Sequence, residues 1–409
     1  MPRCTSIFRG FRGPILPYPK IRAGFQMAHK ITTVAVLGAG AAGLSLAREV
    51  LEAQTPPSNL RIILCDGRQG YHNDRTWCFF EKPDHDLSHL VRKSWAQWSL
   101  SDHRKTLVYT DTQTPYQLLA AGAYYDYCLS LIEKSEYVDL LLGCPVRSFE
   151  KRNGKWTLSI DDGEIEADYI IDTRPPAKDM VKSPFLNQSF YGMEIQTREP
   201  CFNPDRALLM DHLRSDEFGL SFVYLLPFSE REALIEWTRF TPEFLSEHHL
   251  KNELEAILPQ YINQGGYDII RQETGHIPMG FISNQNSEAG YFPAGTRGGA
   301  VRASTGYAFQ RIQRWASTCA RSLIETGRPV AHPQDKRLDA WMDRIFLKVL
   351  LAYPDLAPKI KMNLAGGLSS RQFTRFLTDR AYLRDNISII RSQPVWPFLK
   401  TAIKDMIGK

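Results

Sequence analysis

One carboxylate, Glu236, stands within the largely aromatic and aliphatic segment Ala233–Phe240. A carboxyl group buried among apolar side chains keeps its proton near neutral pH, because burial disfavours the charged form. Upstream, residues 38–43 read Gly-Ala-Gly-Ala-Ala-Gly, a spacing typical of dinucleotide-binding proteins. The combination predicts acid catalysis beside a bound nucleotide cofactor.

Glu236 also has an ordinary interpretation, as a solvated residue of a half-buried strand. Alternate side chains of a strand point to opposite faces, which groups Glu236 with Thr238 and places Trp237 on the other face. Neither face is clearly polar, so the strand pattern alone leaves both interpretations open.

The glycine fingerprint directly follows a predicted strand and precedes a predicted helix. Its first glycine permits a tight turn, its second lets pyrophosphate approach the backbone, and its third lets the helix pack closely on the sheet. Free N–H groups at the helix N-terminus then bind phosphate. We assign this cradle to Gly38, Gly40, Ala41, Ala42 and Gly43. Asp66 ends the next strand, where an acid accepts the adenosine ribose hydroxyls, and the early position of the motif favours FAD over exchangeable NAD.

Composition and charge narrow the class of protein. The chain is 43% hydrophobic and 23% charged, as expected for a globular protein. No apolar run approaches the roughly 18 residues of a spanning helix, so any membrane contact is expected to be peripheral. The formal net charge is +5, but residues 1–30 hold six basic residues and no acid, so residues 31–409 carry −1. This balance gives no indication of nucleic-acid binding.

The N-terminal residues, the cysteines and the histidines are not expected to take part in function. Residues 1–30 are predicted to be a disordered extension or to reflect a misassigned start codon, since Met27 directly precedes the first strand. The seven cysteines lie far apart, as reduced thiols of a cytosolic protein do. The ten histidines show no ligand-like grouping, so we predict no metal site.

The order of predicted elements indicates an α/β fold. Strand Thr32–Leu37, helix Ala41–Ala53 and strand Arg61–Asp66 form a βαβ unit. The later predicted elements are strand 105–109, helix 115–134, strand 138–143, a hairpin over 156–171 that leads to an interior strand, antiparallel strands 220–226 and 233–240, and helices from about 305, one of them starting at Gly306. We predict a Rossmann-like FAD-binding domain (31–85, 120–180 and 270–330), an inserted antiparallel-sheet substrate domain (86–119 and 181–269) and a helical C-terminal region (331–409).

Several separated motifs resemble those of the lycopene β-cyclase family in its bacterial, FAD-dependent form. Besides the fingerprint they are Asn73–Phe80, Asp172–Arg174, Leu234–Thr238, Gly275–Gly280, Gly295–Gly299 and Ser304–Tyr307. The resemblance covers residues 31–409 and implies a fold related to flavin hydroxylases. It implies lycopene and other acyclic carotenoids as substrates and an essential acid at Glu236. It further implies that reduced FAD is required, with NAD(P)H as electron donor, although the cyclisation involves no net redox change.

The motifs extend the two expected sites. The cofactor site gains Arg75, Asp172, Gly295, Gly298 and Gly299. The expected substrate pocket consists of Trp77, Phe79, Tyr224, Trp237, Thr238 and Tyr307. Structural roles stay open for Arg75 as a loop ion pair, for Asp172, and for the glycines as turn formers.

The C-terminal segment 395–407 places its apolar residues on one helical face, with Lys400 and Lys404 opposite. Such a helix either docks on the core or lies on lipid, and we expect a cytoplasmic protein at the membrane periphery. Two other functions stay open. A prenyl reductase or hydroxylase of the same fold would consume NAD(P)H stoichiometrically, and a carotenoid-binding protein would return the polyene unchanged.

Overall fold

A parallel sheet carries the glycine fingerprint. The computed structural model describes residues 31–408 apart from 56, 58, 177–180, 264 and 283–287, so the extension predicted at 1–30 lies outside the described residues. The strand order is β18-β12-β1-β2-β8, and every pairing is parallel. The strands are β18 (Tyr291–Pro293), β12 (Tyr169–Asp172), β1 (Thr32–Leu37), β2 (Leu60–Asp66) and β8 (Val138–Leu142).

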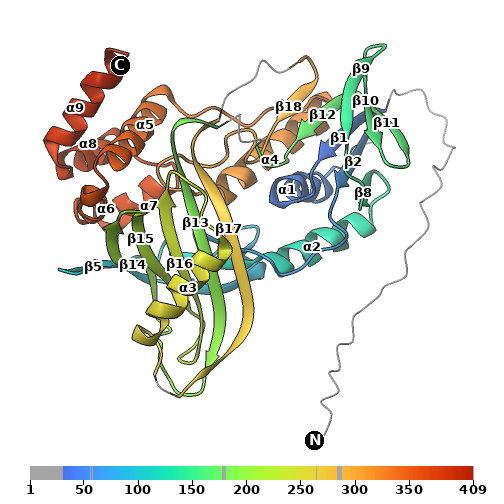
Figure 1. The fold of residues 1–409 in the computed structure, drawn as a ribbon. Coiled ribbons are helices and arrows are strands. Elements are labelled where there is room, and N and C mark those ends of the chain that lie inside the picture. Colours follow the sequence, from blue (N-terminus) through green and yellow to red (C-terminus); the bar gives the residue numbers. More distant parts are fainter. Residues whose placement is uncertain are drawn as a thin grey trace, which may run out of the picture.

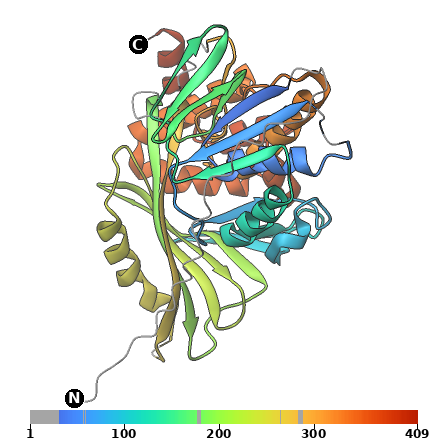
Figure 2. The same cartoon turned by 90° about the vertical axis from the view of Figure 1, so that its right-hand side faces the viewer.

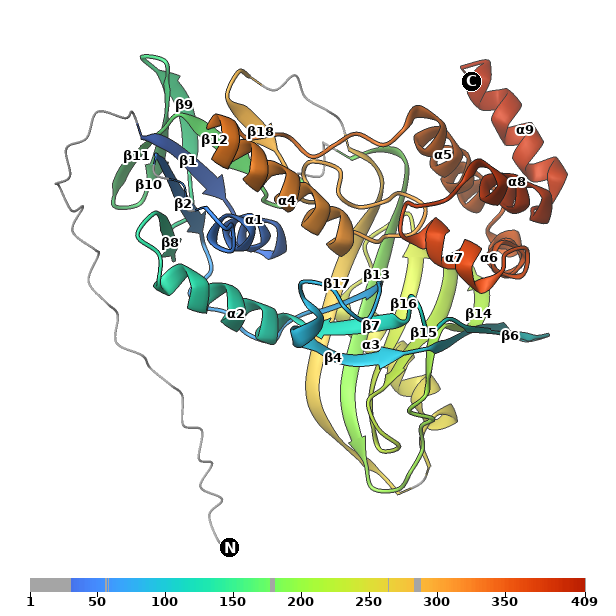
Figure 3. The same cartoon turned by 180° about the vertical axis from the view of Figure 1, so that it is seen from behind.

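Both faces of this sheet are covered (Figures 1 and 3). Val34 and Val36 of β1 belong to a core shared with helices α1 (Ala41–Leu51), α2 (Ala121–Glu133) and α4 (Phe309–Thr326). Ala35 and Leu37 pack instead against a small antiparallel sheet of β9 (Ser148–Arg152), β10 (Lys155–Ile160) and β11 (Gly163–Ala167). Burial on both faces explains why β1 is a continuous apolar run.

The second large layer is a seven-stranded sheet with the order β17-β13-β16-β15-β14-β5-β6. Its strands are β17 (Tyr267–Ile282), β13 (Val181–Thr197), β16 (Glu232–Thr241), β15 (Gly219–Pro227), β14 (Arg206–Asp216), β5 (Gln97–Asp102) and β6 (Thr106–Thr110). Helix α3 (Glu247–Ile257) covers one face, where Leu250 and Leu254 pack against Ile235 and Trp237 (Figure 2).

The other face of the large sheet belongs to a core shared with the C-terminal helices. These are α5 (Arg337–Ala352), α6 (Ala357–Gly366), α7 (Ser370–Leu377), α8 (Leu383–Ser392) and α9 (Val395–Met406). They lie at the opposite end of the molecule from β9–β11 (Figures 1 and 3). Short 3₁₀ turns occur at Ser88–Leu90, Leu258–Gln260 and Pro354–Leu356.

The helix predicted at 115–134 is partly wrong. Residues Tyr116–Ala120 form β7, which pairs with β3 (Thr76–Phe80) and β4 (Val91–Trp95), and α2 begins only at Ala121. Tyr116, Leu118 and Leu119 are almost fully buried between neighbours, so sheet pairing outweighs the helical pattern.

Other predicted boundaries also shift. The segment expected as one run to 171 divides at Asp168, whose carboxylate accepts a hydrogen bond from Thr33 N at 2.9 Å, so β12 leaves the hairpin to pair with β1. The helix expected from Gly306 begins at Phe309. The boundary drawn at residue 270 falls inside β17, which belongs wholly to the large sheet. Residues 86–119 are shared between the large sheet and the β3-β7-β4 sheet.

Candidate active site

A cavity of about 1120 Å³ lies between the two layers. It begins at the carboxyl ends of β1 and β2, where ligands bind in open α/β sheets. From there it continues along β13, β15, β16 and β17 and reaches α5, α6 and α7. One cavity therefore joins the predicted cofactor region to the predicted acid.

The glycine fingerprint forms the first wall of this cavity. Gly38 has a φ of +96°, which favours glycine, and Gly40 is the N-cap of α1. A Cβ added at Gly43 would overlap the carbonyl oxygen of Gly38, so only glycine lets α1 approach the loop this closely. Gly38, Gly40 and Ala41 line the cavity, whereas Ala42 and Gly43 pack behind them.

Asp66 lines the cavity and also supports the fingerprint loop. Its Oδ2 accepts a hydrogen bond from Ala39 N at 2.7 Å, and its Oδ1 accepts one from Arg68 N at 2.9 Å. The Tyr71 hydroxyl donates to the Ala39 carbonyl at 2.8 Å. The acid thus fixes the loop conformation in addition to any contact it makes with a ribose.

Besides Ala42 and Gly43, four residues predicted for the cofactor site are not among those that line the cavity. Asp172 is fully buried and pairs with Arg174 at 2.6 Å and Arg297 at 3.3 Å. The Gly298 amide donates to the Ala294 carbonyl at 3.1 Å. Gly295 and Gly299 belong to the same turn, in which Thr296 does line the cavity. These placements favour a structural role for Asp172 and a role as turn formers for the three glycines, rather than direct contact with a cofactor.

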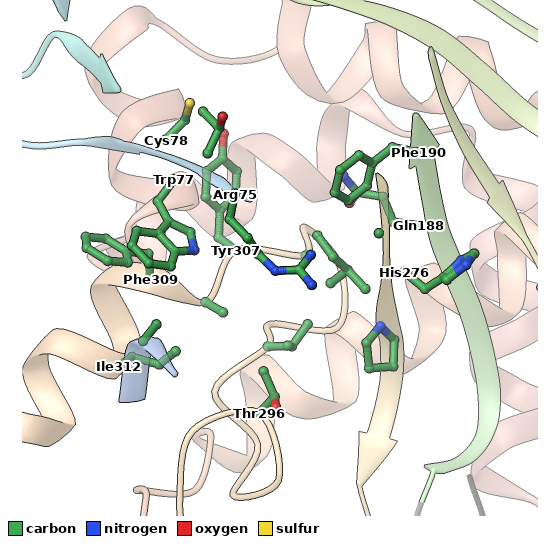
Figure 4. A pocket seen from close by; sticks show the side chains of 18 of the residues that line it. Arg75, Trp77, Cys78, Gln188, Phe190, His276, Thr296, Tyr307, Phe309 and Ile312 are labelled. Atoms are coloured by element: carbon green, nitrogen blue, oxygen red, sulfur yellow. The ribbon is translucent and has the colours of Figure 1, made fainter. Parts of the chain in front are cut away.

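Arg75 and Trp77 enter the cavity from the segment that begins at Asn73. Trp77 stacks on Phe309 with ring centroids 5.0 Å apart, and Figure 4 shows this pair facing Gln188, Phe190 and His276 across the cavity. The Arg75 guanidinium reaches between the two walls (Figure 4). Its ion pair with Asp74 is long, at 3.8 Å, and its Nη1 donates to the Thr274 carbonyl at 3.4 Å.

The predicted substrate pocket is partly assembled. Tyr224, Thr238 and Tyr307 line the cavity with Trp77, and the Tyr224 hydroxyl hydrogen-bonds to that of Tyr116. Phe79 does not line it but lies in the core, 3% exposed, with its ring near Phe309.

Trp237 was wrongly assigned to the substrate pocket. Its indole nitrogen donates to Glu253 of α3 at 2.8 Å, on the face of the sheet opposite Glu236. Strand alternation, which had already separated these two side chains, explains the error.

Glu236 is 9% exposed and lines the cavity from the middle of β16. Burial, followed by the nearby charge of Glu273, raises the pKa of the Glu236 carboxyl well above its ordinary range, and Arg271 opposes the shift. The solvated-strand interpretation is therefore wrong. The geometry places a carboxyl group with a raised pKa on the wall of a largely apolar cavity.

Several cavity residues escaped the sequence analysis. They are Gln188 and Phe190 of β13, Glu273 and His276 of β17, Phe346 of α5 and Lys361 of α6. Burial lowers the pKa of Lys361 to about 8, and its Nζ lies 4.9 Å from the centroid of the Phe240 ring. Strand alternation places Arg271 and Glu273 on one face, but only the pairing of distant strands shows which face lines the cavity.

Comparison with known proteins now decides the family. A family model described as lycopene cyclase protein matches residues 33–403. The chain belongs to the lycopene cyclase family. This confirms the resemblance, and the match includes the fingerprint, the large sheet and most of the C-terminal helices.

Two named members of the lycopene cyclase family are similar over most of their length. A lycopene beta-cyclase from Paracoccus sp. (strain N81106 / MBIC 01143) is 26% identical over 388 residues, which cover 90% of this chain and 96% of the relative. A lycopene beta-cyclase from Pantoea ananas is 22% identical over 379 residues, which cover 88% of this chain and 94% of the relative. The chain is accordingly an enzyme of the lycopene cyclase family.

Solved structures show the fold at low sequence identity. A geranylgeranyl bacteriochlorophyll reductase-like protein from Thermoplasma acidophilum has a TM-score of 0.59 at 12% identity, covering 90% of this chain and 98% of that one. A flavoprotein/dehydrogenase from Cytophaga hutchinsonii also has a TM-score of 0.59 at 12% identity, covering 92% of this chain and 100% of that one. A p-nitrophenol 4-monooxygenase from Pseudomonas putida has a TM-score of 0.55 at 12% identity, covering 92% of this chain and 98% of that one. The predicted fold class is confirmed.

The described residues contain neither a candidate metal centre nor a candidate membrane-spanning helix. Over the part of the chain that the structure describes, no group of three or more His, Cys, Asp or Glu side chains is arranged to hold a metal ion. Within the same residues, no helix is both long and apolar enough to cross a membrane.

Proposed function

We propose that this enzyme is a lycopene β-cyclase in which Glu236 is the acid that starts ring closure. The observation that carries the proposal is a buried carboxyl group with a raised pKa on the wall of a cavity that also reaches the nucleotide fingerprint. An unactivated alkene is protonated only by an acid held in a dry site.

FAD fits the first part of the cavity. Helix α1 has no side-chain cap and no acidic residue in its first turn, so its N–H groups can meet phosphate. A Cβ added at Gly40 would meet only the Arg68 guanidinium, at 3.7 Å, so the space beside this glycine is open. Gly38, Gly40 and Ala41 would hold the pyrophosphate, Asp66 the ribose, and Arg75 would approach the ring system. The reduced cofactor, with NAD(P)H as donor, would supply negative charge beside a carbocation without net redox change.

The residues of the large sheet account for the chemistry of ring closure. Glu236 donates its proton to C2 of the terminal C1=C2 bond of the substrate, which leaves a cation at C1. The C5=C6 bond attacks C1, the resulting C5 cation loses the C6 proton to solvent to give the β-ring, and solvent returns a proton to Glu236. Aromatic faces stabilise such cations by about 0.5–2 kcal/mol each. Trp77 lines the cavity and is suited to this role, whereas Phe79 and Trp237 are not.

The C-terminal helices give the enzyme a surface suited to lipid, where a water-insoluble substrate resides. Val395 and Trp396 are 73% and 70% exposed, and only Pro397 and Thr401 of α9 are buried. We call the exposed apolar residues of this region the C-terminal apolar patch: Tyr382, Leu383, Ile387, Ile390, Val395, Trp396, Leu399, Ile403, Met406 and Ile407. Such exposure favours an interfacial helix over simple core docking, and we propose a cytoplasmic enzyme bound at the membrane periphery.

Replacing Trp396 with Ser should weaken binding to lipid vesicles roughly tenfold, because the indole would no longer bury its apolar area in the interface. Phe218→Ser is the matched control, since Phe218 is also an exposed aromatic residue, 44% accessible, but lies in the turn between β14 and β15 of the large sheet. Vesicle sedimentation measures both variants. Equal losses in the two variants would contradict a specific role for the C-terminal apolar patch.

One assay separates cyclisation from the two other functions. Purified enzyme with FAD is reduced once under anaerobic conditions and given an excess of lycopene in vesicles. A cyclase should convert many equivalents into a product of unchanged mass and shorter absorption wavelength. A reductase would stop after one equivalent and change the mass, and a carrier, or a hydroxylase deprived of oxygen, would return lycopene unchanged. Either of the last two results would overturn the proposed function.

A further inference from the structure

Glu236 lies beside a second buried carboxyl group, that of Glu273. Gly192 of β13 is paired with Glu236 on one side and with Glu273 on the other, so the three residues form a row across the large sheet. A Cβ added at Gly192 would lie 2.6 Å from Cγ of Glu236 and 3.4 Å from Cγ of Glu273. The glycine thus leaves space over which the two side chains approach each other, and both line the cavity.

The two carboxyl groups have different partners. Glu273 accepts hydrogen bonds from the Thr76 hydroxyl at 2.8 Å and from the Arg271 guanidinium. Arg271 also donates to Thr76 at 2.8 Å and pairs with Glu194 at 3.2 Å. These donors stabilise the ionised form of Glu273. No hydrogen bond from the described residues contributes to the pKa of Glu236, which is thus the member of the pair that retains a proton.

We propose that Glu273 is a positioning residue for the acid: its carboxylate, held by Arg271 and Thr76, keeps Glu236 protonated and close to the substrate cavity. This inference rests on the proposed function, because Glu273 acts only through Glu236. Two neighbouring carboxyl groups in a dry site do not both ionise readily, so a charge fixed on one keeps the proton on the other. Thr76 directly precedes Trp77, which links this pair to the segment that enters the cofactor side of the cavity.

The other titratable groups that face Glu236 do not replace this charge. They are Arg271 on β17, Tyr224 on β15 and Cys78 on β3. Burial raises the pKa of Tyr224 and of Cys78, so both are neutral near pH 7. Burial also raises the pKa of Glu273, whereas the Arg271 charge and the hydrogen bond from Thr76 lower it. Among these groups, Glu273 is the one that supplies a negative charge.

Glu273→Gln tests the proposal through the pH dependence of cyclisation. The substitution removes the charge and retains the size of the side chain, so Glu236 should lose its proton at a lower pH. The alkaline limb of the rate profile should move down by about one pH unit or more. At the acid end, where Glu236 is protonated in both proteins, the variant should approach the wild-type rate. Glu273→Asp retains the charge, and its alkaline limb should stay near that of the wild type even if the rate falls.

Glu194→Gln is the matched control, because it removes a different buried carboxylate from the same Arg271. Glu194 is paired across the sheet with Leu234 rather than with Glu236. The alkaline limb of the rate profile of Glu194→Gln should therefore stay at the wild-type position. An unchanged limb in Glu273→Gln would overturn the proposal. So would an equal shift in Glu194→Gln, since any loss of charge near Arg271 would then have the same effect.

Infrared spectroscopy gives a readout that does not require turnover. The difference spectrum between the wild type and Glu236→Gln at pH 7 should contain the C=O stretch of a protonated carboxyl group. As the pH is raised, Glu273→Gln should lose that band about one pH unit or more below the wild type, with flavin content and melting temperature as checks on folding. A band lost at the same pH in Glu273→Gln and in the wild type would overturn the pairing. If the wild type fails to cyclise lycopene, the proposed function fails, and the infrared result still decides whether Glu273 controls Glu236.

Discussion

Glu236→Gln should lower the rate of lycopene cyclisation by about 10⁴-fold or more while the protein keeps its fold and its flavin. The substitution preserves size and removes the transferable proton, and general acid catalysis is commonly worth about 10²–10⁴-fold. Protonation of an unactivated alkene has no easy alternative route, so the loss should reach the top of that range. Single-turnover conversion, followed by pigment chromatography, measures the effect. Flavin binding should survive because β16 does not contribute to the phosphate cradle.

Two further variants make this result specific. Glu232→Gln makes the same chemical change on the same strand, where Glu232 is paired with Arg92, and should leave the rate near that of the wild type. Glu236→Asp should retain weak activity at most, since misplacement of a catalytic group by ~1 Å costs about 10²-fold. A Gln variant that still cyclises lycopene would place the acid elsewhere in the cavity, at Asp74 or Glu273.

Gly43→Ala should produce the largest loss on the cofactor side. The added Cβ would overlap the backbone carbonyl of Gly38, so α1 would have to move away from the loop that it completes. Overpacking of this kind costs about 1–3 kcal/mol, which corresponds to roughly 5- to 150-fold in flavin affinity. Flavin fluorescence during equilibrium dialysis measures the change.

Gly70→Ala is the control for this substitution, because a Cβ at Gly70 would meet nothing within 4 Å. It makes the same glycine-to-alanine change in the same part of the chain and should leave flavin affinity unaltered. Full flavin retention by Gly43→Ala would show that the close approach of α1 is not needed for the cofactor.

The nucleotide-binding half of the fold could be predicted because its signals are local. The turn at Gly38, the close packing at Gly43 and the acid at Asp66 all lie within one βαβ unit. The substrate side depends instead on pairings between distant segments. Tyr116–Ala120 has a helix-like pattern, yet it pairs with β3 and β4, which the local sequence does not show.

The two carboxyl groups of the site show the same difference between local sequence signals and signals that depend on the pairing of distant strands. Glu236 could be predicted because it is the one carboxylate in the largely apolar segment Ala233–Phe240. Glu273 could not, because it follows Arg271 and Gln272 in a segment that resembles an exposed edge strand. Its role emerges only when β13 brings Gly192 between the two carboxyl groups. The incorrect prediction for Trp237 has another cause. The family motif favours a place for Trp237 in the pocket, although strand alternation puts its side chain on the face opposite Glu236.

The most direct test of acid-initiated cyclisation is a reaction run in D₂O. Glu236 exchanges its proton with solvent before each turnover, and the C6 hydrogen is lost when the ring forms. The product should therefore contain one deuteron per ring, located at C2, and Glu236→Gln should form no labelled product. A cyclic product that carries no deuterium, or that carries hydrogen traced to the reductant, would contradict the assignment of Glu236 as the proton donor.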